Sequence, residues 1–564
     1  MKRFRLIIPR FPYFNIYSSI AMPPLGAMSV ATCVRKSTDL AVEVIDENNY
    51  KGDLDHRAVQ AERPADVVGF YGGLTSTIPR LYSVARQYKE MGAVTVAGGV
   101  HINALPGEAL DNAIDYVLTG EGEYLLPEFL KALAAGDDPA LIRGVIFRRD
   151  GQTIDTGRRP PLSDLDSLPA PDLSLLVNLR RKVTFIPISR TRGCNFSCEF
   201  CSVKNHLGPC RWSSPQVAFD QFVRYSNEGF KSFFVVDDNF VQDREGTKEL
   251  CRMLIDFRIR NKRYMDIVVQ VRAEVARDHE MLYLMKKAGV TTMCIGYESP
   301  IDEDLRNMKK GVTVEKLKEY TEIIRSHGFY IHGMFIFGYP SFKDSVYRPS
   351  MTMKERAQRY LQFVRECKID TIQVMKPVPL PGTVLRQRLE AEGRLFPRYL
   401  VDWDKYDGNW VCFQPDEGCS AKDLQNYATW IMRKVYHPWQ IAKLLCLIPY
   451  YPIDFALNAG VETLRGIKRY FKQNPISTLP HRSIRYHART AMHVAGTALS
   501  NAQKAVSKRL RNARLKSAGS LIYESWKRNF RKERFYEVLD AASRHVKTAS
   551  ARPSRLKEGK SGNR

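Results

Sequence analysis

Short runs of β-branched and aromatic residues alternate with helix-length segments in two separate series along this 564-residue chain. The first series occupies residues 4–9, 41–45, 66–70, 93–97 and 114–118. The second follows Phe185 and occupies residues 233–236, 267–271, 292–295, 331–336 and 371–374. Strands that alternate with helices are typical of βαβ units with parallel strands, and the length allows two or three domains. We therefore expect an α/β protein with a parallel sheet in each of two domains.

Glycines follow three strands of the first series, in the runs Tyr71-Gly-Gly73, Gly98-Gly99 and Gly120-Glu-Gly122. Glycine after a parallel strand lets the backbone approach a ligand, and open α/β sheets bind their ligands at this carboxyl edge. One such pair could simply form a tight turn. Three at corresponding strand ends predict a binding edge.

Three cysteines, Cys194, Cys198 and Cys201, lie within eight residues of one another. Thiolates are soft ligands that suit iron–sulfur clusters, and three of them can bind three irons of a cubane while the fourth iron stays open. The alternatives are a disulfide pair, chance crowding, and a zinc site that would take His206 or Cys210 as its fourth ligand. The spacing favours the cluster.

The Cys-x3-Cys-x2-Cys pattern resembles the signature of radical S-adenosylmethionine (SAM) enzymes. The resemblance implies a [4Fe-4S] cluster whose open iron chelates the amino and carboxylate groups of SAM, and whose electron cleaves SAM to a 5′-deoxyadenosyl radical. It implies that Phe200, before the third cysteine, lies against the adenine. With the cluster strand, the second series gives about six βα units, so we expect a partial (β/α)6 barrel over residues 184–400.

In such a barrel the chemistry belongs at the carboxyl ends of the strands, where this chain carries polar residues. The candidate SAM contacts that the resemblance implies there are Asp237, Asp238, Asn239, Gln270, Arg272 and Glu298. A carboxylate suits an ammonium group or sugar hydroxyls, and a guanidinium suits a carboxylate. The same residues could instead cap helices or pair with one another.

The segments Pro23-Pro-Leu-Gly26, Gly98-Gly-Val-His101 and Thr119-Gly-Glu-Gly-Glu123 resemble those of the cobalamin-binding domain that precedes the barrel in one class of radical SAM enzymes. The resemblance covers about residues 1–140 and implies a Rossmann-like domain. The implied cobalamin contacts are Gly72, Gly73, Thr75, Gly98, Gly99, His101, Gly120 and Glu121. The Asp-x-His-x-x-Gly motif of other cobalamin proteins is absent, which leaves the cobalt ligand open. His101 could replace it or be a hydrogen-bonded structural residue.

The excess of positive charge is concentrated near the C-terminus. The formal charge is +25, and residues 431–564 carry 28 Lys and Arg against seven Asp and Glu. We expect a proline-rich linker over 141–183, a helical cap over 401–475 and a basic helical or disordered tail over 476–564. The composition favours contact of the tail with an anionic membrane over nucleic-acid binding, and a solvated helical hairpin is the third alternative.

Cysteine usage and hydropathy indicate the cellular compartment. The 11 cysteines have no disulfide-framework spacing, which favours a reducing cytoplasm with, at most, peripheral membrane association. No uninterrupted apolar run is long enough to span a membrane, and the start of the chain predicts a strand rather than a secretory signal.

The resemblance implies an enzyme that methylates an unactivated carbon of a lipid or natural product, with cobalamin as the methyl carrier and a flavodoxin or ferredoxin as electron donor. A radical cyclase, oxidase or rearrangement enzyme of the tetrapyrrole type is the first alternative. An RNA-modifying radical SAM enzyme is the second. Transfer-RNA methylthiotransferases usually carry three further cysteines in their N-terminal domain, however, where this chain holds only Cys33.

Overall fold

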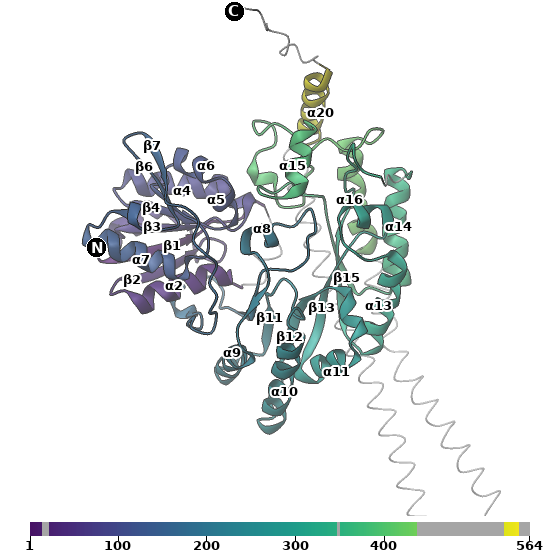
Figure 1. Ribbon diagram of the computed structural model, residues 1–564, viewed down its shortest axis with the longest axis horizontal. Coiled ribbons are helices and arrows are strands. Elements are labelled where there is room, and N and C mark those ends of the chain that lie inside the picture. Colours follow the sequence, from purple (N-terminus) through teal and green to yellow (C-terminus); the bar gives the residue numbers. More distant parts are fainter. Residues whose placement is uncertain (14–21, 347–349, 437–534, 552–564) are drawn as a thin grey trace, which may run out of the picture. The chain divides into compact units, whose positions relative to one another are not determined.

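The computed structural model describes residues 1–13, 22–346, 350–436 and 535–551 (Figure 1). The chain divides into one unit of residues 1–431 with 528–564 and a second unit of residues 432–527. The sites described below all lie in the first unit. Most of the predicted basic tail and the end of the predicted cap fall outside the described residues.

The first sheet has seven strands in the order β2-β1-β3-β4-β5-β6-β7. They are β1 (Arg3–Ile8), β2 (Ala41–Asp46), β3 (Val67–Tyr71), β4 (Val94–Gly98), β5 (Tyr116–Leu118), β6 (Val145–Arg149) and β7 (Gln152–Asp155). Strands β1 to β5 are parallel, which confirms the first predicted series, and β6 and β7 are antiparallel additions. The hairpin therefore extends the first sheet from within the segment predicted as a linker.

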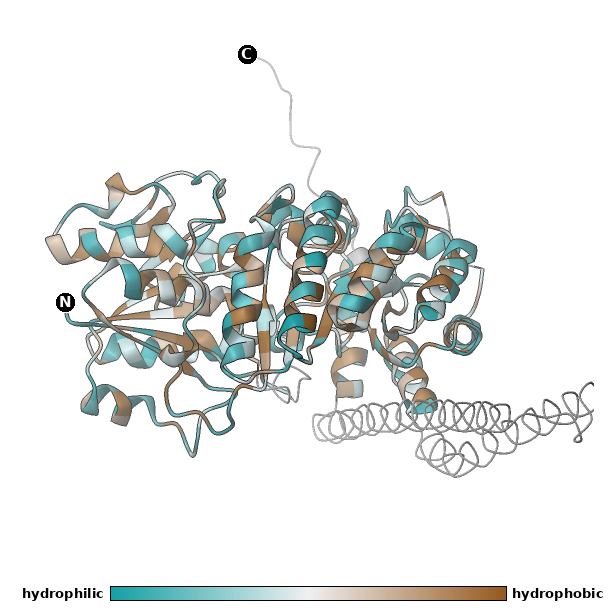
Figure 2. Ribbon diagram, turned by 90° about the horizontal axis from the view of Figure 1, so that it is seen from below, coloured by the Kyte–Doolittle hydropathy of each residue, from teal (hydrophilic) through white to brown (hydrophobic). Residues whose placement is uncertain are grey.

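The helices of this part follow the strands in alternation. They are α2 (Leu25–Ser37), α3 (His56–Glu62), α4 (Ile78–Glu90), α5 (Val100–Ala104), α6 (Pro106–Asp111) and α7 (Gly122–Ala135). Helix α2 packs on α7, and α3 packs on α4. Both faces of a parallel sheet are buried, so its strands are largely apolar; Phe4, Leu6, Val67 and Val96 accordingly lie in one core. Figure 2 shows the apolar colouring along these strands.

The second sheet has six parallel strands in the order β15-β14-β13-β12-β11-β8. They are β8 (Phe185–Ile188), β11 (Ser232–Val235), β12 (Asp266–Val271), β13 (Val290–Glu298), β14 (Tyr330–Ile336) and β15 (Thr371–Met375). Each strand pairs with the next one along the chain in this series, and β8 pairs with β11. The α/β fold class with about six βα units in the second series is confirmed.

Helices connect these strands and continue beyond them. They are α8 (Val203–Leu207), α9 (Pro215–Asn227), α10 (Arg244–Arg260), α11 (His279–Ala288), α12 (Asp302–Asn307), α13 (Val314–Ser326), α14 (Met353–Glu366), α15 (Val384–Ala391), α16 (Ala421–Val435) and α20 (Phe535–Ala551). Several begin at a side-chain cap, and α14 begins with a full capping box between Thr352 and Glu355. Helix α20 lies within the predicted tail and contacts Trp410 and Lys422. Among the described residues no helix is both long and apolar enough to cross a membrane.

Candidate functional site

The three cysteines lie on a loop that is closed at its base. The short strands β9 (Thr191–Arg192) and β10 (Arg211–Trp212) pair in antiparallel fashion, and the Cys194 amide donates to the Gly208 carbonyl at 3.2 Å. Gly193 has a φ of +86°, and a Cβ there would lie 2.5 Å from the Pro209 carbonyl oxygen. Glycine is therefore required at this position, because a side chain would open the base of the cysteine loop.

Cys194, Cys198 and Cys201 are free, half-buried thiols, so none of the three forms the disulfide that the spacing left open. Burial raises the pKa of Cys201 to about 12, and the neighbouring Cys198, Asp238 and Cys194 add to this effect. Within the described ranges, no three His, Cys, Asp or Glu side chains are placed around one point that would hold a single metal ion. A cubane does not need such a point, because each thiolate binds a different iron.

Two buried carboxylates hold the cysteine loop in place. Asp237 Oδ1 accepts hydrogen bonds from Ser189 Oγ and from the backbone amides of Arg190 and Thr191, at 2.8–3.0 Å. Glu199, between the second and third cysteines, is 3% exposed. Its carboxylate is 2.8 Å from Arg388 Nη1 and 3.0 Å from Lys309 Nζ.

Predicted SAM contacts from β12 and β13 meet beside Cys198. Arg272 Nη1 lies 3.9 Å from Cys198 Sγ, and Arg272 Nη2 donates to Glu274 and to the Lys310 carbonyl at 2.5 Å. Lys310 Nζ in turn lies 2.8 Å from Glu298 Oε1. Glu298 has a φ of +61°, in the left-handed region that non-glycine residues rarely adopt. This strained backbone position lies where the pairing register between β13 and β14 shifts.

The predicted SAM contacts Asp238 and Asn239, which follow β11, and Gln270 of β12 differ in their hydrogen-bond partners. Asp238 is open to the main cavity, and its carboxylate has no hydrogen bond or ion pair to any residue that the structure describes. Burial within the protein and the charge of Asp237 raise the pKa of Asp238 to about 6. Asn239 Nδ2 donates to Gln242 at 3.2 Å, and Gln270 Nε2 donates to the Asp237 carbonyl at 3.4 Å. Asp238 is thus the carboxylate left available for a ligand.

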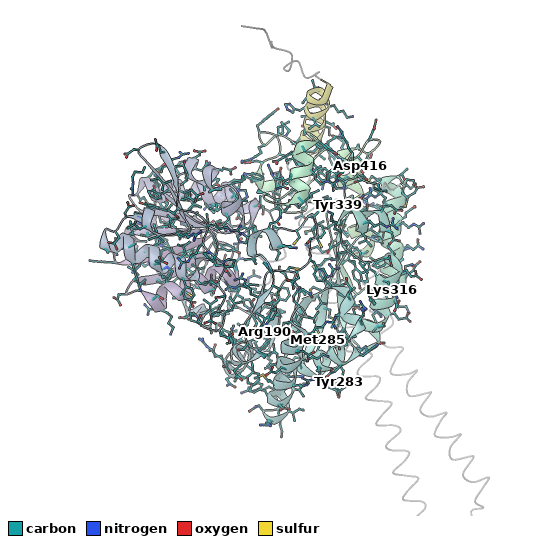
Figure 3. All side chains as sticks on the ribbon, in the orientation of Figure 1. Arg190, Tyr283, Met285, Lys316, Tyr339 and Asp416 are labelled. Carbon is teal, nitrogen blue, oxygen red and sulfur yellow. The ribbon has the colours of Figure 1, made fainter. Side chains whose placement is uncertain are left out.

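Phe200, the predicted adenine contact, is half-buried. Its ring centroid lies 6.4 Å from that of Tyr339, at 76° between the planes. Tyr339, which Figure 3 labels, comes from the loop after β14. The ring of Phe196, in the same cysteine loop, carries the Arg272 guanidinium 3.9 Å above it.

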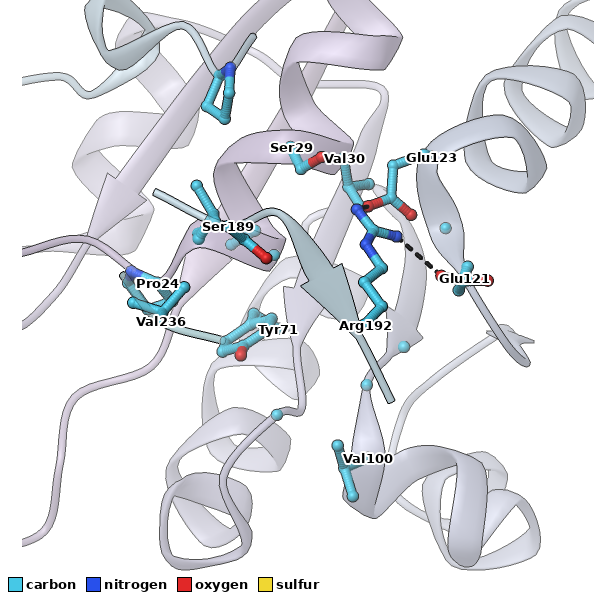
Figure 4. Close-up of a pocket in the computed structure, with 18 of the residues that line it drawn as sticks. Pro24, Ser29, Val30, Tyr71, Val100, Glu121, Glu123, Ser189, Arg192 and Val236 are labelled. Carbon is cyan, nitrogen blue, oxygen red and sulfur yellow. Dashed lines mark hydrogen bonds and ion pairs between the residues drawn. The ribbon is translucent and has the colours of Figure 1, made fainter. Parts of the chain in front are cut away.

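A cavity of about 590 Å³ lies between the carboxyl edge of the first sheet and the start of the second (Figure 4). One wall consists of the ends of β3, β4 and β5 with the start of α2, and the opposite wall includes residues 189–192, Val236 and Asp238. The binding edge predicted from the glycines therefore opens toward the segment that leads into the cysteine loop.

The predicted cobalamin contacts divide into two groups. The cavity is lined by Gly73, Gly98, Gly99, Gly120 and Glu121, and its lining does not include Gly72, Thr75 or His101. Gly72 has a packing role. A Cβ on Gly99, whose φ is +116°, would lie 2.6 Å from the Gly72 carbonyl carbon.

His101 makes its contacts outside the cavity. Its Nδ1 lies 3.2 Å from Thr75 Oγ1, its Nε2 lies 3.7 Å from Glu108 Oε1, and its ring contacts Trp403. Burial lowers the pKa of His101. These contacts fit the structural alternative for this residue.

Four charged residues join the two walls of the cavity. Arg192, two residues before Cys194, is 2.9 Å from Glu121 and 2.6 Å from Glu123, while Arg211 is 2.8 Å from Glu121. Figure 4 shows Arg192 extending between these glutamates. The arginines keep the pKa of Glu121 below its usual value even though burial acts to raise it. Of this network, only Glu121 appeared among the sequence-predicted contacts, because ion pairs across such separations leave no local pattern.

Two family models match the chain. The model described as B12 binding domain matches residues 18–130, and the model described as Radical SAM superfamily matches residues 188–347. The first match covers the glycine edge of the cavity, and the second covers the cysteine loop. The chain belongs to the radical SAM enzymes that carry a cobalamin-binding domain.

Curated relatives of this cobalamin-binding radical SAM enzyme include methyltransferases and a cyclase. The chain is 27% identical to an uncharacterized methyltransferase of Pyrococcus horikoshii, covering 68% of this chain and 81% of the relative. It is 25% identical to the anaerobic magnesium-protoporphyrin IX monomethyl ester cyclase of Rubrivivax gelatinosus (66% and 67%). It is also 25% identical to the bacteriochlorophyllide d C-8(2)-methyltransferase of Chlorobaculum tepidum (77% and 91%).

The fold of the enzyme is also found among solved structures. The radical SAM methyltransferase TsrM from Kitasatospora setae, with cobalamin and a [4Fe-4S] cluster bound, superposes with a TM-score of 0.54 at 17% identity. The match covers 70% of this chain and 79% of that one. At this identity the likeness concerns the fold alone.

The described residues fit the cofactors of this enzyme class, which are a [4Fe-4S] cluster, SAM and cobalamin. Three free thiols are available on one closed loop. Asp238 supplies an unpaired carboxylate, and the glycine edge supplies backbone that a corrin can approach closely. The predicted assignment of individual residues to SAM and to cobalamin stays a prediction.

His332 on β14 provides a prediction on pH dependence. It lies in register with Cys294 of β13 and Thr371 of β15, and its Nδ1 is 3.0 Å from Thr371 Oγ1. Burial lowers the pKa of His332 to about 4. Because the unfolded chain protonates this residue at about 6.5, this group makes the folded state lose stability as pH falls through the interval between the two values.

In the parent protein, His332 should account for roughly 1.5 kcal/mol of the fall in unfolding free energy between about pH 6.5 and pH 5. We expect His332→Gln to lack this part of the fall. Urea denaturation at the two pH values measures this difference. His279→Gln, at an exposed position, is the matched control and should keep the parent slope. Equal pH slopes in His332→Gln and the parent would contradict the prediction.

Proposed function

We propose that the enzyme transfers a methyl group from cobalamin to an unactivated carbon of a lipid or natural product. The observation that carries the proposal is the single cavity of about 590 Å³ lined both by the glycine edge and by the approach to the cysteine loop. A methyl carrier and a site of radical formation must both reach one substrate carbon, and this cavity provides the common space. The methyltransferase relatives support the same assignment.

When bound, the cluster with SAM supplies a carbon-centred radical and cobalamin supplies the methyl group. The protein's own part is to bind, orient and exclude water. Asp238 is suited to hold the ammonium or the hydroxyls of SAM, and Arg272 beside Cys198 is suited to its carboxylate. The cavity lining includes many apolar side chains, among them Leu74, Leu165 and Leu168, which shield reactive species from water and suit a substrate with hydrocarbon parts.

The test uses anaerobically reconstituted enzyme, SAM with a deuterated methyl group, and candidate lipid or tetrapyrrole extracts. We expect both S-adenosylhomocysteine and 5′-deoxyadenosine to accumulate, together with a product that carries the CD₃ group. One SAM supplies the methyl group and another supplies the radical, so both by-products are required. Production of 5′-deoxyadenosine with no S-adenosylhomocysteine would count against methylation.

A radical cyclisation or oxidation without methyl transfer is the second candidate, and the similarity to the magnesium-protoporphyrin cyclase favours it. The same experiment separates the two functions, because the cyclisation gives 5′-deoxyadenosine and an unlabelled product. We further propose a flavodoxin or ferredoxin as electron donor in the cytoplasm. Membrane or RNA binding by the basic tail concerns residues outside those described, and a steep salt dependence of RNA affinity would favour the RNA-modifying alternative.

A further inference from the structure

The strand order of the first sheet indicates where along its carboxyl edge a ligand binds. Strand β1 lies between β2 and β3, so successive connections run in opposite directions from the β1–β3 pair. Open α/β sheets bind ligands outside the carboxyl ends of the strands at such a switch point. Tyr71 is the last residue of β3 and therefore stands at this point.

Small neighbouring residues leave room for the Tyr71 side chain in the cavity wall. It lines the cavity, and Figure 4 shows its ring among the residues of the wall. A Cβ on Gly73 would lie 2.2 Å from Tyr71 Cζ, and one on Gly26 would lie 3.9 Å from Cε2. A side chain at residue 73 would displace the ring, so glycine at this position leaves the space that the phenol occupies.

The Tyr71 hydroxyl has no hydrogen-bond or ion-pair partner among the residues that the structure describes. Burial raises the pKa of Tyr71, so the phenol stays protonated at neutral pH. A neutral hydroxyl at the floor of a cavity is free to meet a bound group, and it is a weak metal ligand compared with an imidazole.

Among the other titratable groups that line this cavity, Asp238 has a carboxylate unpaired within the described residues but stands on the opposite wall. His101 contacts Thr75, Glu108 and Trp403 outside the cavity lining. Glu121 and Glu123 are paired with arginines. His206 lines the cavity from α8 on the opposite wall, with its Nδ1 3.4 Å from the side-chain amide group of Asn103.

We propose that the Tyr71 side chain lies beneath the corrin ring of bound cobalamin, on the sheet side of the cobalt, in the place where other cobalamin proteins put a histidine. The sheet side of the metal then has no nitrogen donor, neither from the protein nor from the benzimidazole of the cofactor. This inference rests on cobalamin binding and not on the reaction that follows, so its test does not depend on the substrate.

The test is the EPR spectrum of the cobalamin-loaded, full-length enzyme after reduction to Co(II). A nitrogen beneath cobalt splits the hyperfine lines into triplets, as in free cob(II)alamin with its benzimidazole bound, which serves as the positive control. We expect no triplets in the parent protein and triplets in Tyr71→His. Leu74→His, which adds an imidazole elsewhere in the same cavity lining, should show none.

Triplets in the parent protein would overturn the proposal, because a nitrogen would then hold the place given to Tyr71. Their absence from cobalamin-loaded Tyr71→His would also overturn it. If Tyr71→His fails to retain cobalamin, Tyr71→Phe decides. It keeps the ring, and loss of the hydroxyl should shift the absorption bands of bound cob(III)alamin, whereas an unchanged spectrum would place the phenol away from the metal.

Discussion

Replacing Cys198 with alanine should remove both the iron–sulfur chromophore and the formation of 5′-deoxyadenosine. With only Cys194 and Cys201 left on the loop, two irons of a cubane would lack a protein ligand where the parent has one such iron. The cluster would then no longer offer SAM a single open iron. Cys198 also lies 3.9 Å from Arg272, so the substitution acts where the predicted SAM contacts meet. Anaerobic reconstitution followed by iron and sulfide analysis, Mössbauer spectroscopy and product quantification measures the effect.

Cys210→Ala is the matched control for this experiment. Cys210 follows the same loop but is buried, and it lies outside the Cys-x3-Cys-x2-Cys spacing of the three candidate ligands. We expect it to keep both cluster and activity. A protein that lost its cluster through Cys210→Ala and kept it in Cys198→Ala would show that a different set of thiols binds the metal.

Replacing Glu121 with alanine should lower the unfolding free energy by about 3 kcal/mol and release cobalamin. The change removes the carboxylate partner of Arg211 and one of the two carboxylate partners of Arg192. The Glu121 side chain is only 9% exposed, so these ion pairs are largely shielded from water. Removing one member of a buried charge pair is costly because the remaining charge is desolvated without compensation. Denaturant titration and cobalamin retention on gel filtration measure the two effects.

Glu128→Ala provides the control, since Glu128 lies in α7, the helix that begins directly after Glu121. Its pair with Arg159 is largely exposed, so its loss should cost less than about 1 kcal/mol. Glu121→Gln separates charge from hydrogen bonding, because it keeps acceptors for the arginines. If Glu121→Ala were as mild as Glu128→Ala, the four-residue network would not hold the two walls together.

The strands could be predicted because their signal is local. Each run of β-branched residues identified a strand to within two residues in the first series, and most of the glycines singled out after these strands line the cavity. The hairpin of β6 and β7 was missed within a segment interpreted as a linker. Its signal was present in Asp150-Gly151, whose φ angles of 51° and 77° fit the two-residue turn that this dipeptide favours.

The site was predictable as a set of residue types but not as a set of contacts. The SAM contact of Asp237 stays a prediction, and the sequence did not indicate that its Oδ1 receives three hydrogen bonds from the segment before the cysteine loop. Glu199, Arg192 and Tyr71 have roles that depend on neighbours far away in the sequence or on the order of strands in the sheet. A single sequence holds no periodic pattern for such long-range contacts.

The hairpin and the residues that follow it determine where the first domain could be separated from the rest. Strand β6 covers the edge of β5, and Leu175 and Leu176 pack into the same core as Phe4 and Val44. A fragment cut at residue 140 would therefore expose a strand edge and open the core, and would be prone to aggregate. Exchange of cobalamin modules between relatives should accordingly place the junction near residue 183, just before β8.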